Sequence, residues 1–269
     1  MNIDTVKLAY FSPTGTTRKI LNEIAEGLGA NSIEQIDLTL PAADTLSSAA
    51  IQDELVVIGV PVYEGRVSET AIPRLQQLKA NKTPAVIVVM YGNRDFEDAL
   101  LELNDLTREM GFLPIAGGAF VGEHSMATED VPLANGRPDV DDMKAAKAFG
   151  AEIRAKINSL KSVDEASSIT PPGNTPYIDH GSSPMMKEIA AATLEENCTL
   201  CGECATVCPV GAITIGESVT TDTIACILCN ACVKNCSDGA RVLDHPLANK
   251  VFGWVSKNYQ ARRDPVTFI

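Results

Sequence analysis

The part of the chain up to residue 160 alternates between short apolar runs and segments in which apolar residues recur at helical spacing. The apolar runs are Val6–Phe11, Leu55–Val60, Ala85–Tyr91 and Phe112–Val121, and Ile33–Leu38 is a shorter strand candidate. A continuous run rich in β-branched residues, such as Leu55–Val60, is typical of a strand buried on both faces. We therefore expect five strands in this part of the chain.

Segments with a single apolar stripe lie between these strands. The first follows Val6–Phe11, and we expect Gly27 and Gly29 to end its helix. The other helical segments are Ile72–Leu78, Phe96–Met110 and Pro138–Leu160. Strands that alternate with helices predict βαβ units and a parallel sheet, here five-stranded and doubly wound rather than closed into a barrel.

All eight cysteines lie between Cys198 and Cys236, in two runs with the spacing C-x2-C-x2-C-x3-C. The second run is an internal repeat of the first, in which Cys226 takes the place of Cys198. In runs of this kind three cysteines ligate one cluster and the fourth ligates the other. The spacing therefore predicts two [4Fe–4S] clusters. The first set is Cys198, Cys201, Cys204 and Cys236, and the second set is Cys226, Cys229, Cys232 and Cys208.

Zinc and disulfides are the alternative interpretations of these cysteines. Structural zinc normally uses two cysteine pairs separated by a longer stretch, and disulfides need an oxidising compartment. The start MNIDTVKLAYF has no basic region or long apolar core of a signal peptide. No apolar run approaches the ~20 residues that span a bilayer. The pattern favours iron–sulfur clusters in a reducing cytoplasm.

The segment CTLCGECATVCPVGAI, which begins at Cys198, resembles the first half of the bacterial two-cluster ferredoxins. This resemblance implies a small α+β domain, which we expect at residues 187–245. The second half departs from the family at Ser237, where proline is usual, and continues as Asp238-Gly239-Ala240. No ligand is lost, so the departure concerns the shape of this loop and the potential of the cluster that Cys236 would bind.

The segment SPTGTTRK lies where the first strand must turn into the first helix. Its hydroxyl groups, its glycine and the free N–H groups of a helix start favour an anion, and the helix dipole adds to this preference. No lysine stands in the Walker-A position, so a phosphate monoester is favoured over a nucleoside triphosphate. A capped helix start without a ligand is the alternative. The expected binding residues are Ser12, Thr14, Gly15, Thr16 and Thr17.

Two further loops, Pro61–Arg66 and Tyr91–Phe96, follow strands that end at the same edge of the expected sheet. Ligands of doubly wound sheets bind at this edge. Each loop contains a tyrosine that could stack on a flat heterocycle and an arginine that could offset its negative charge. The expected cofactor-binding residues are Pro61, Val62, Tyr63, Gly65, Arg66, Tyr91, Gly92, Asn93, Arg94 and Phe96.

The segment S-P-T-G-T-T fits the [ST]-x-T-G-x-T phosphate loop of flavodoxins at every fixed position, and the resemblance covers residues 3–160. It implies a flavodoxin-like fold that binds FMN, with the phosphate on Ser12–Thr17 and the ring between the two other loops. With the cysteine runs included, the whole chain resembles the flavodoxin–ferredoxin fusion proteins of anaerobes. We expect an FMN-binding domain at residues 1–161.

The remaining segments are a linker and a tail. Residues 162–186 are rich in Ser, Pro and Gly, which is typical of a linker. In the tail, 246–269, one weak helical stripe is interrupted by Gly253 and consists of Leu247, Val251, Val255 and Tyr259. We expect the tail to dock on the protein itself, with contact to a partner or a membrane surface as the alternative.

The formal net charge of −13 argues against nucleic acid as a partner and favours an acidic docking surface for basic redox proteins. After the fifth strand, Glu123 and His124 either form a polar rim or relay a proton to a reduced flavin. No G-x-G-x-x-G follows a strand, so a nicotinamide site is not expected.

These observations predict an electron-transfer protein that passes single electrons between the clusters and FMN and connects a low-potential redox partner with another acceptor. The first alternative is a flavin-dependent reductase of a small molecule, fed by its own clusters, with open space over the flavin. The second is a redox-sensing or assembly protein, which no sequence feature supports directly.

Overall fold

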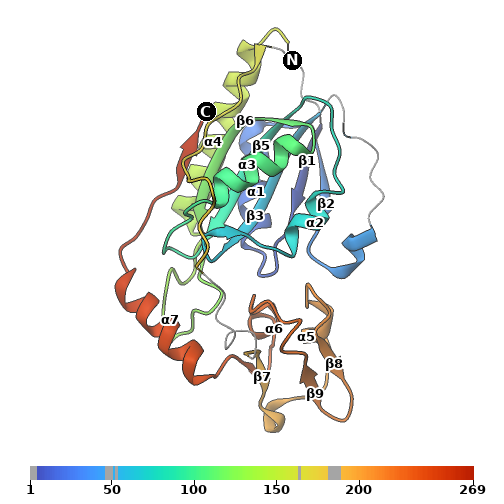
Figure 1. Ribbon diagram of the computed structural model, residues 1–269, viewed down its shortest axis with the longest axis vertical. Helices are drawn as coiled ribbons and strands as arrows, with labels where there is room; N and C mark the ends of the chain where they lie inside the picture. The colour runs from blue at the N-terminus through green and yellow to red at the C-terminus, as the bar shows by residue number, and fades with distance from the viewer. Residues whose placement is uncertain (1–4, 46–50, 52–53, 163–164, 181–188) are drawn as a thin grey trace.

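The computed structural model describes residues 5–45, 51, 54–162, 165–180 and 189–269. The chain folds into an α/β layer structure and a smaller cysteine-containing module, which lies against one end of the sheet (Figure 1). Residues 163–164 and 181–186 of the expected linker, and 187–188 of the expected cysteine domain, lie outside the described residues. Among the described helices, none is both long and apolar enough to cross a membrane.

Five parallel strands form the centre of the sheet, as expected from the five strand candidates. Their spatial order is β2 (Ser32–Asp37), β1 (Thr5–Tyr10), β3 (Leu55–Tyr63), β5 (Thr83–Tyr91) and β6 (Phe112–Val121). Numbered among the parallel strands alone, this order is 2-1-3-4-5, the flavodoxin-like variant of the doubly wound fold. The predicted fold class is confirmed.

Two short strands that the sequence pattern does not predict extend this sheet. Strand β4 (Arg66–Val67) folds back on β3 through Glu64 and Gly65, whose φ angles of 53° and 77° suit the tight turn of a hairpin. Strand β11 (Val266–Phe268) pairs antiparallel with β6, Thr267 opposite Gly118. The end of the chain thus returns to the sheet, although the sequence places it beyond the cysteine module.

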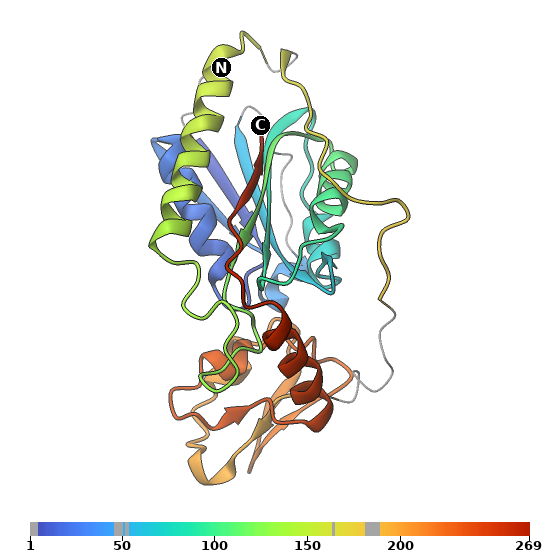
Figure 2. The same cartoon turned by 90° about the vertical axis from the view of Figure 1, so that its left-hand side faces the viewer.

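Helices cover both faces of the sheet (Figure 2). One face is covered by α1 (Thr16–Leu28) and α4 (Val140–Ser159), and the other by α2 (Ala71–Leu75) and α3 (Ala99–Glu109). Each face has its own apolar core. Because strand β5 is buried at every position, it contributes side chains to both cores.

The structure corrects the expected end of the first helix. Gly29 ends α1 with a φ of 64°, but Gly27 lies inside the helix. A Cβ on Gly27 would lie 2.0 Å from the Lys147 carbonyl oxygen, and a Cβ on Gly150 would lie 2.1 Å from the Ile24 carbonyl oxygen. Both glycines therefore allow α1 and α4 to approach closely, and Gly27 serves packing rather than helix termination.

The cysteine module repeats its backbone as well as its sequence. Two one-turn helices, α5 (Glu203–Thr206) and α6 (Ala231–Lys234), each follow a cysteine pair. Positive φ angles recur at equivalent positions of the two repeats, at Leu200 and Leu228, Gly202 and Asn230, and Gly211 and Gly239. Short strands accompany them in two pairs, β7 (Ala192–Thr193) with β10 (Arg241–Val242), and β8 (Ile213–Ile215) with β9 (Val219–Thr221).

The described part of the expected linker is bound to the α/β part. The Asn174 and Ile178 N–H groups donate to the two carboxylate oxygens of Asp98 at 2.8 and 2.6 Å, and the Tyr177 hydroxyl donates to Asp105 at 2.6 Å. Residues 165–180 are therefore a packed connection beside α3, not a free spacer.

The tail forms helix α7 (Pro246–Asn258), which packs on the loop after β6, as expected for docking on the protein itself. The most buried stripe is shifted by one position from the predicted one. Ala248, Phe252 and Ser256 are buried and Val251 is 46% exposed, while Val255 and Tyr259 of the predicted stripe are partly buried beside them. Helix α7 continues through Gly253, so that glycine does not interrupt it.

Candidate cofactor sites

The expected phosphate loop lies at the carboxyl end of β1. Gly15 has a φ of 80°, and no side chain hydrogen bond caps α1 there. The Ser12 Oγ accepts from the Arg18 N–H at 3.1 Å, which folds the loop over the helix start. The N–H groups of Thr16 and Thr17 belong to the first helical turn, where no partner exists within the helix. Thr14 is half-buried. This arrangement fits a phosphate group.

The two other expected loops lie beside each other. The Asp98 N–H donates to the Gly65 carbonyl at 3.1 Å, and a Cβ on Gly65 would lie 1.8 Å from a carboxylate oxygen of Glu97. Tyr91 and Phe96 contact each other with ring centroids 5.6 Å apart. Pro61, Val62 and Tyr63 are half-buried at the end of β3. The sheet thus brings the expected loops to one edge, as a cofactor spanning them would require.

The charged groups of these loops are already paired, which the sequence does not predict. The Arg66 guanidinium donates to both carboxylate oxygens of Glu102 at 2.6 and 2.8 Å. The Arg94 guanidinium donates to Glu97 at 2.7 and 3.0 Å. The expectation that these two arginines offset charge on a heterocycle is therefore not supported by the structure, and their loops would contact a cofactor through other groups.

Asn93 is bound by the tail. Its amide, 2% exposed, donates to the Tyr259 carbonyl at 2.6 Å and the Ala261 carbonyl at 2.9 Å, and accepts from the Arg263 N–H at 3.3 Å. Gly92 is also enclosed, since a Cβ there would lie 2.4 Å from the His124 ring. The side chain of Asn93 therefore holds the C-terminal segment beside the expected ring-binding loop.

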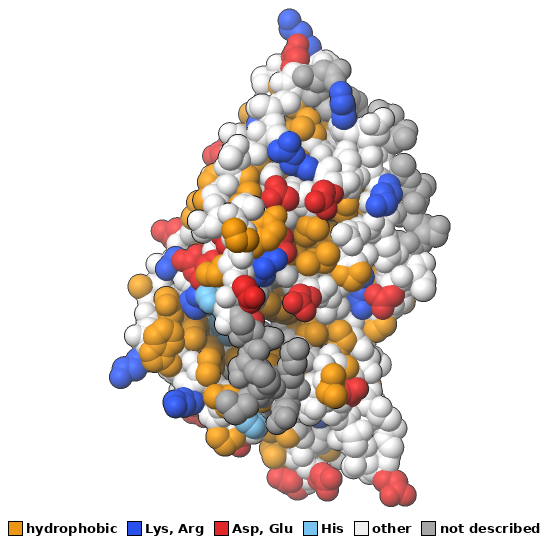
Figure 3. Space-filling view, in the orientation of Figure 1, with side chains coloured by type: hydrophobic (Ala, Val, Ile, Leu, Met, Phe, Trp, Pro, Cys, Tyr) orange, Lys and Arg blue, Asp and Glu red, His pale blue; other side chains and the backbone are white. Residues whose placement is uncertain are grey.

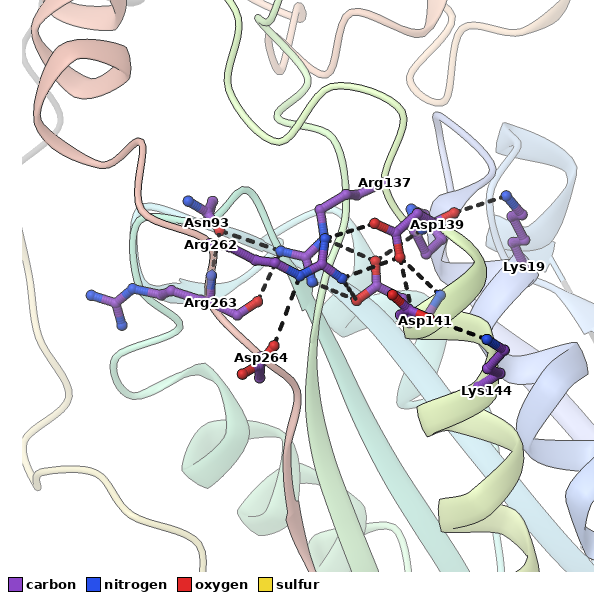
Figure 4. A network of polar contacts seen from close by, with 11 residues as sticks. Lys19, Asn93, Arg137, Asp139, Asp141, Lys144, Arg262, Arg263 and Asp264 are labelled. Atoms are coloured by element: carbon purple, nitrogen blue, oxygen red, sulfur yellow. Dashed lines mark hydrogen bonds and ion pairs between the residues drawn. The ribbon is translucent and has the colours of Figure 1, made fainter.

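An arginine–aspartate network fixes the same segment to the start of α4 (Figure 4). Arg137 forms a two-point contact with the fully buried Asp142 and donates to the Arg263 carbonyl at 2.8 Å. Arg262 donates to Asp139 at 2.7 Å, and this contact holds the pKa of the Asp139 carboxyl well below its usual value. Asp139 also caps α4 by accepting from the Asp142 N–H.

Glu123 and His124 have structural partners. Glu123 contacts Lys234 of the cysteine module and accepts from the Gly136 N–H at 2.8 Å. Burial lowers the pKa of His124 to about 4, and its ring lies 4.8 Å from that of Phe252. The imidazole is therefore neutral at pH 7, and its Nδ1 accepts from the Met126 N–H at 3.2 Å. These contacts favour the polar-rim interpretation of Glu123 and His124.

The first cysteine set comes together around a single cavity. Cys198, Cys201, Cys204 and Cys236 all line it, together with Asp238 and Arg241. Cys236 reaches this cavity from the second run, as crossed ligation requires. The loop after Cys236, which has Ser237 in place of proline, is tied to the first run because the Thr199 hydroxyl donates to Asp238 at 2.8 Å.

The cysteines of the second set influence one another electrostatically. The pKa of the Cys229 thiol is raised to about 12, chiefly by burial and to a smaller extent by Cys232, Cys226 and Cys208. No three His, Cys, Asp or Glu side chains within the described ranges converge on a point that one metal ion would occupy. A cubane core is wider than one ion, and the four sulfur donors around the cavity of the first set suit it. The donor set around this cavity fits a cluster.

Two contacts connect the second cysteine set with the loops at the sheet edge. Ile227, which lies between Cys226 and Cys229, packs against the apolar core between the sheet and α3. Burial raises the pKa of Tyr63 well above its usual value, with a smaller electrostatic contribution from Cys229. Arg74 is 2% exposed and donates to the Pro209 carbonyl, next to Cys208, at 2.8 Å. The same guanidinium donates at 2.6 Å to the carbonyl of Thr39, whose hydroxyl accepts from the Ser12 N–H. A hydrogen-bonded connection thus runs from the phosphate loop to the cysteine module.

Residues 193–214, which contain the first cysteine run, match the protein family described as "4Fe-4S binding domain". The chain therefore carries a 4Fe–4S binding motif. Together with the strand order of the sheet, this match confirms the two-part organisation of a flavodoxin-like α/β part followed by a ferredoxin-type module.

Several solved structures are similar to part of the chain. A flavodoxin from the domain Archaea is 17% identical, with a TM-score of 0.37, and the match covers 57% of this chain and 99% of that one. An oxidoreductase from Corynebacterium diphtheriae is 17% identical, with a TM-score of 0.39 and coverages of 58% and 99%. An NADH:FMN oxidoreductase (EMOB, apo form) is 15% identical, with a TM-score of 0.42 and coverages of 59% and 92%. No curated protein matches the sequence.

Proposed function

We propose that this chain is an electron-transfer protein that holds one FMN and two [4Fe–4S] clusters and connects a low-potential redox partner with another acceptor. The FMN phosphate is held at Ser12–Thr17, and the loops Pro61–Arg66 and Tyr91–Phe96 flank the ring. The first and second cysteine sets, as defined above, ligate one cluster each. A flavin exchanges electrons singly or in pairs, whereas a cubane cluster exchanges one at a time.

The observation that carries this proposal is the position of the second cysteine set. The Pro209 carbonyl, next to Cys208, accepts from the buried Arg74, which also donates to the carbonyl of Thr39 beside the expected phosphate loop. Ile227, from the second cysteine run, packs against the apolar core between the sheet and α3. A cluster on this set would therefore lie next to the sheet edge where doubly wound folds bind their ligands. Joining both groups in one chain replaces a diffusional encounter with an intramolecular step.

The first cysteine set is the contact point for an outside partner. Cys201 and Leu200 are exposed, whereas Cys229 is buried. No lysine or arginine lies between Lys187 and Lys234 in the sequence, and Figure 3 shows acidic side chains at the lower end of the module. The exposed acidic residues are Glu195, Glu196, Glu203, Glu217 and Asp222. Such a surface attracts a protein with a basic docking face.

The protein itself supplies shielding and fixed geometry. Arg74 anchors the module through the Pro209 carbonyl, Asn230 donates to the Ser125 carbonyl at 3.1 Å, and Lys234 donates to the Ala127 carbonyl at 2.7 Å. These contacts come from both halves of the module and fix it on the sheet edge. A fixed module keeps the separation between the cofactor sites constant, which an electron carrier requires.

Anaerobic reconstitution of the full chain tests the proposal. We expect about eight iron atoms and eight sulfides per chain, with FMN as the bound flavin. Cys236→Ser should remove the cluster of the first set and Cys208→Ser that of the second set, while Ser237→Ala keeps both. Four iron atoms or none in the unaltered chain would contradict the two-cluster assignment, and loss of the opposite cluster in either variant would contradict the crossed ligand sets.

A further inference from the structure

Arg241 is a buried cation in the centre of the cysteine module. It is 3% exposed and lies on β10, opposite Thr193 of β7. Its guanidinium donates to the Thr193 hydroxyl at 2.6 Å, the Thr221 hydroxyl at 2.7 Å and the Ala191 carbonyl at 2.8 Å. All three acceptors are uncharged.

This arginine breaks the internal repeat. In the register that aligns Cys198 with Cys226, its equivalent is Ile213, which is buried in the small apolar core of the module. Thr193 and Thr221 are equivalents of each other in the same register, and Arg241 binds both. Arg241 therefore contacts the same position in each of the two repeats. An exact repeat would have an aliphatic residue in place of this arginine.

Among the described residues, the guanidinium of Arg241 donates to hydroxyl, carbonyl and sulfur atoms and to no carboxylate. Its Nε is buried and has no hydrogen-bond partner. A buried cation without a counter-charge is strongly unfavourable. The sequence nevertheless has an arginine at a position where the other repeat has isoleucine, which points to a counter-charge supplied by a group that the protein binds.

Both cysteine sets lie next to this guanidinium. Arg241 lines the cavity of the first set together with Cys204, and its Nη2 lies 3.8 Å from the Sγ of Cys232 in the second set. Cys204 and Cys232 are themselves equivalent positions of the two runs. Four thiolates around each core make both sites anionic. The counter-charge that Arg241 lacks is therefore available on both sides.

We propose that Arg241 tunes the reduction potentials of both clusters. Its buried positive charge stabilises the reduced state of each cluster and so raises both potentials together. This inference rests on the proposed function, because it requires the clusters. On reduction each cluster gains one electron from the reductant, and no bond forms or breaks. The fixed positive charge of Arg241 stabilises the added negative charge. Hydrogen bonds and nearby charges tune the reduction potentials of such clusters in general.

The test is an anaerobic potentiometric titration of the reconstituted full chain, followed by the electron paramagnetic resonance signals of the reduced clusters. Arg241→Met removes the charge and the hydrogen-bond donors and keeps an unbranched side chain. We expect both midpoint potentials to become more negative while the iron count stays at that of the unaltered chain. Arg241→Lys should keep both potentials near their original values. Ile213→Met, the matched control in the other repeat, should change neither.

Three results would distinguish the possible failures. Unchanged potentials in Arg241→Met with a full iron count overturn the role of Arg241 and leave the proposed function intact. A shift of only one potential overturns the shared role. Absence of iron from the unaltered chain contradicts the proposed function itself. If Arg241→Met assembles fewer clusters, the midpoint potentials of Arg241→Gln and Arg241→Lys are compared instead. Equal potentials in these two variants would overturn the inference.

Discussion

The sheet and the cysteine module are stabilised in different ways. The sheet has an extensive apolar core on each face, with side chains such as Phe11, Ile58 and Phe149 almost completely buried. The module has one small cluster of four buried residues, and two of them, Cys204 and Cys208, are expected ligands. A domain with so little apolar burial depends on its metal for folding. We therefore expect the sheet to form its proposed binding site before a cofactor arrives, and the module to be completed only when its clusters bind.

Removal of iron should have the largest effect and should be confined to the module. We expect an iron chelator under reducing conditions to abolish hydrogen-exchange protection across residues 189–245. Protection in β1, β3 and β5 should change by less than about tenfold, which corresponds to roughly 1.4 kcal/mol. The measurement is hydrogen exchange followed by mass spectrometry on the loaded and chelated protein.

Two outcomes would contradict this contrast. A chelated module that keeps its protection would show that its small core suffices for folding. A sheet that loses protection together with the module would show that the two regions fold as one unit.

Arg74 is the most deeply buried of the described side chains that join the two regions, so Arg74→Met should be the most damaging single substitution at their contact. Leaving a buried hydrogen-bonding group without its partner costs about 1–3 kcal/mol. The carbonyl groups of Leu38, Thr39 and Pro209 would lose their donor. Anaerobic urea unfolding measures the loss. Arg108→Met removes an exposed charge from α3 and should stay within about 0.5 kcal/mol.

His124 makes the stability of the sheet edge depend on pH. Its pKa is about 4 in the folded protein, below the usual value of 6.5, because of burial and the nearby positive charges of Arg94 and Lys234. Between these two values the unfolded chain takes up a proton that the folded chain does not. The free energy of unfolding should therefore fall as the pH drops from about 6.5 to about 4, by about 3 kcal/mol in total.

His124→Gln should remove this part of the pH dependence in urea unfolding curves, whereas His180→Gln, which alters a half-exposed histidine, should retain it. Equal pH dependence in His124→Gln and the unaltered protein would show that the imidazole does not stay neutral in the folded state.

Two glycines in helices should respond in opposite directions. Gly27→Ala places a methyl group against the Lys147 carbonyl and should destabilise the sheet by about 1–3 kcal/mol. Gly253→Ala has no neighbour within 4 Å and should stabilise α7 by about 0.5–1 kcal/mol. Thermal unfolding measures both. A neutral Gly27→Ala would mean that α1 and α4 can move apart without loss.

Four of the five parallel strands could be predicted because each is a largely apolar run, and burial on both faces of a parallel sheet requires such runs. Strand β2 is mostly exposed and contains only two apolar residues. Burial on one face of a helix is harder to locate. The stripe in α7 is shifted by one residue because Ala248 and Ser256, which are small, occupy the buried face. Gly27 is hard to interpret for a related reason. In the sequence, a glycine that lets two helices pack closely looks the same as a glycine that ends a helix.

The ligand sets could be expected from spacing alone, because cluster chemistry fixes the separation of the cysteines. The partners of a single charged residue cannot be predicted in this way, because no fixed spacing in the sequence marks them. Arg66 and Arg94 stand at the expected edge but are neutralised by Glu102 and Glu97, which lie further along the chain. Arg241 could have been found by aligning the two repeats, because it stands where the first repeat has Ile213.

The most direct test of the central claim is to follow the iron–sulfur and flavin absorbance of the reconstituted full chain after rapid anaerobic mixing with a one-electron reductant. We expect electrons to reach the flavin in a first-order phase whose rate does not depend on protein concentration, because the step is intramolecular. Clusters that become reduced while the flavin stays oxidised, or a flavin phase that accelerates in proportion to protein concentration, would contradict the account.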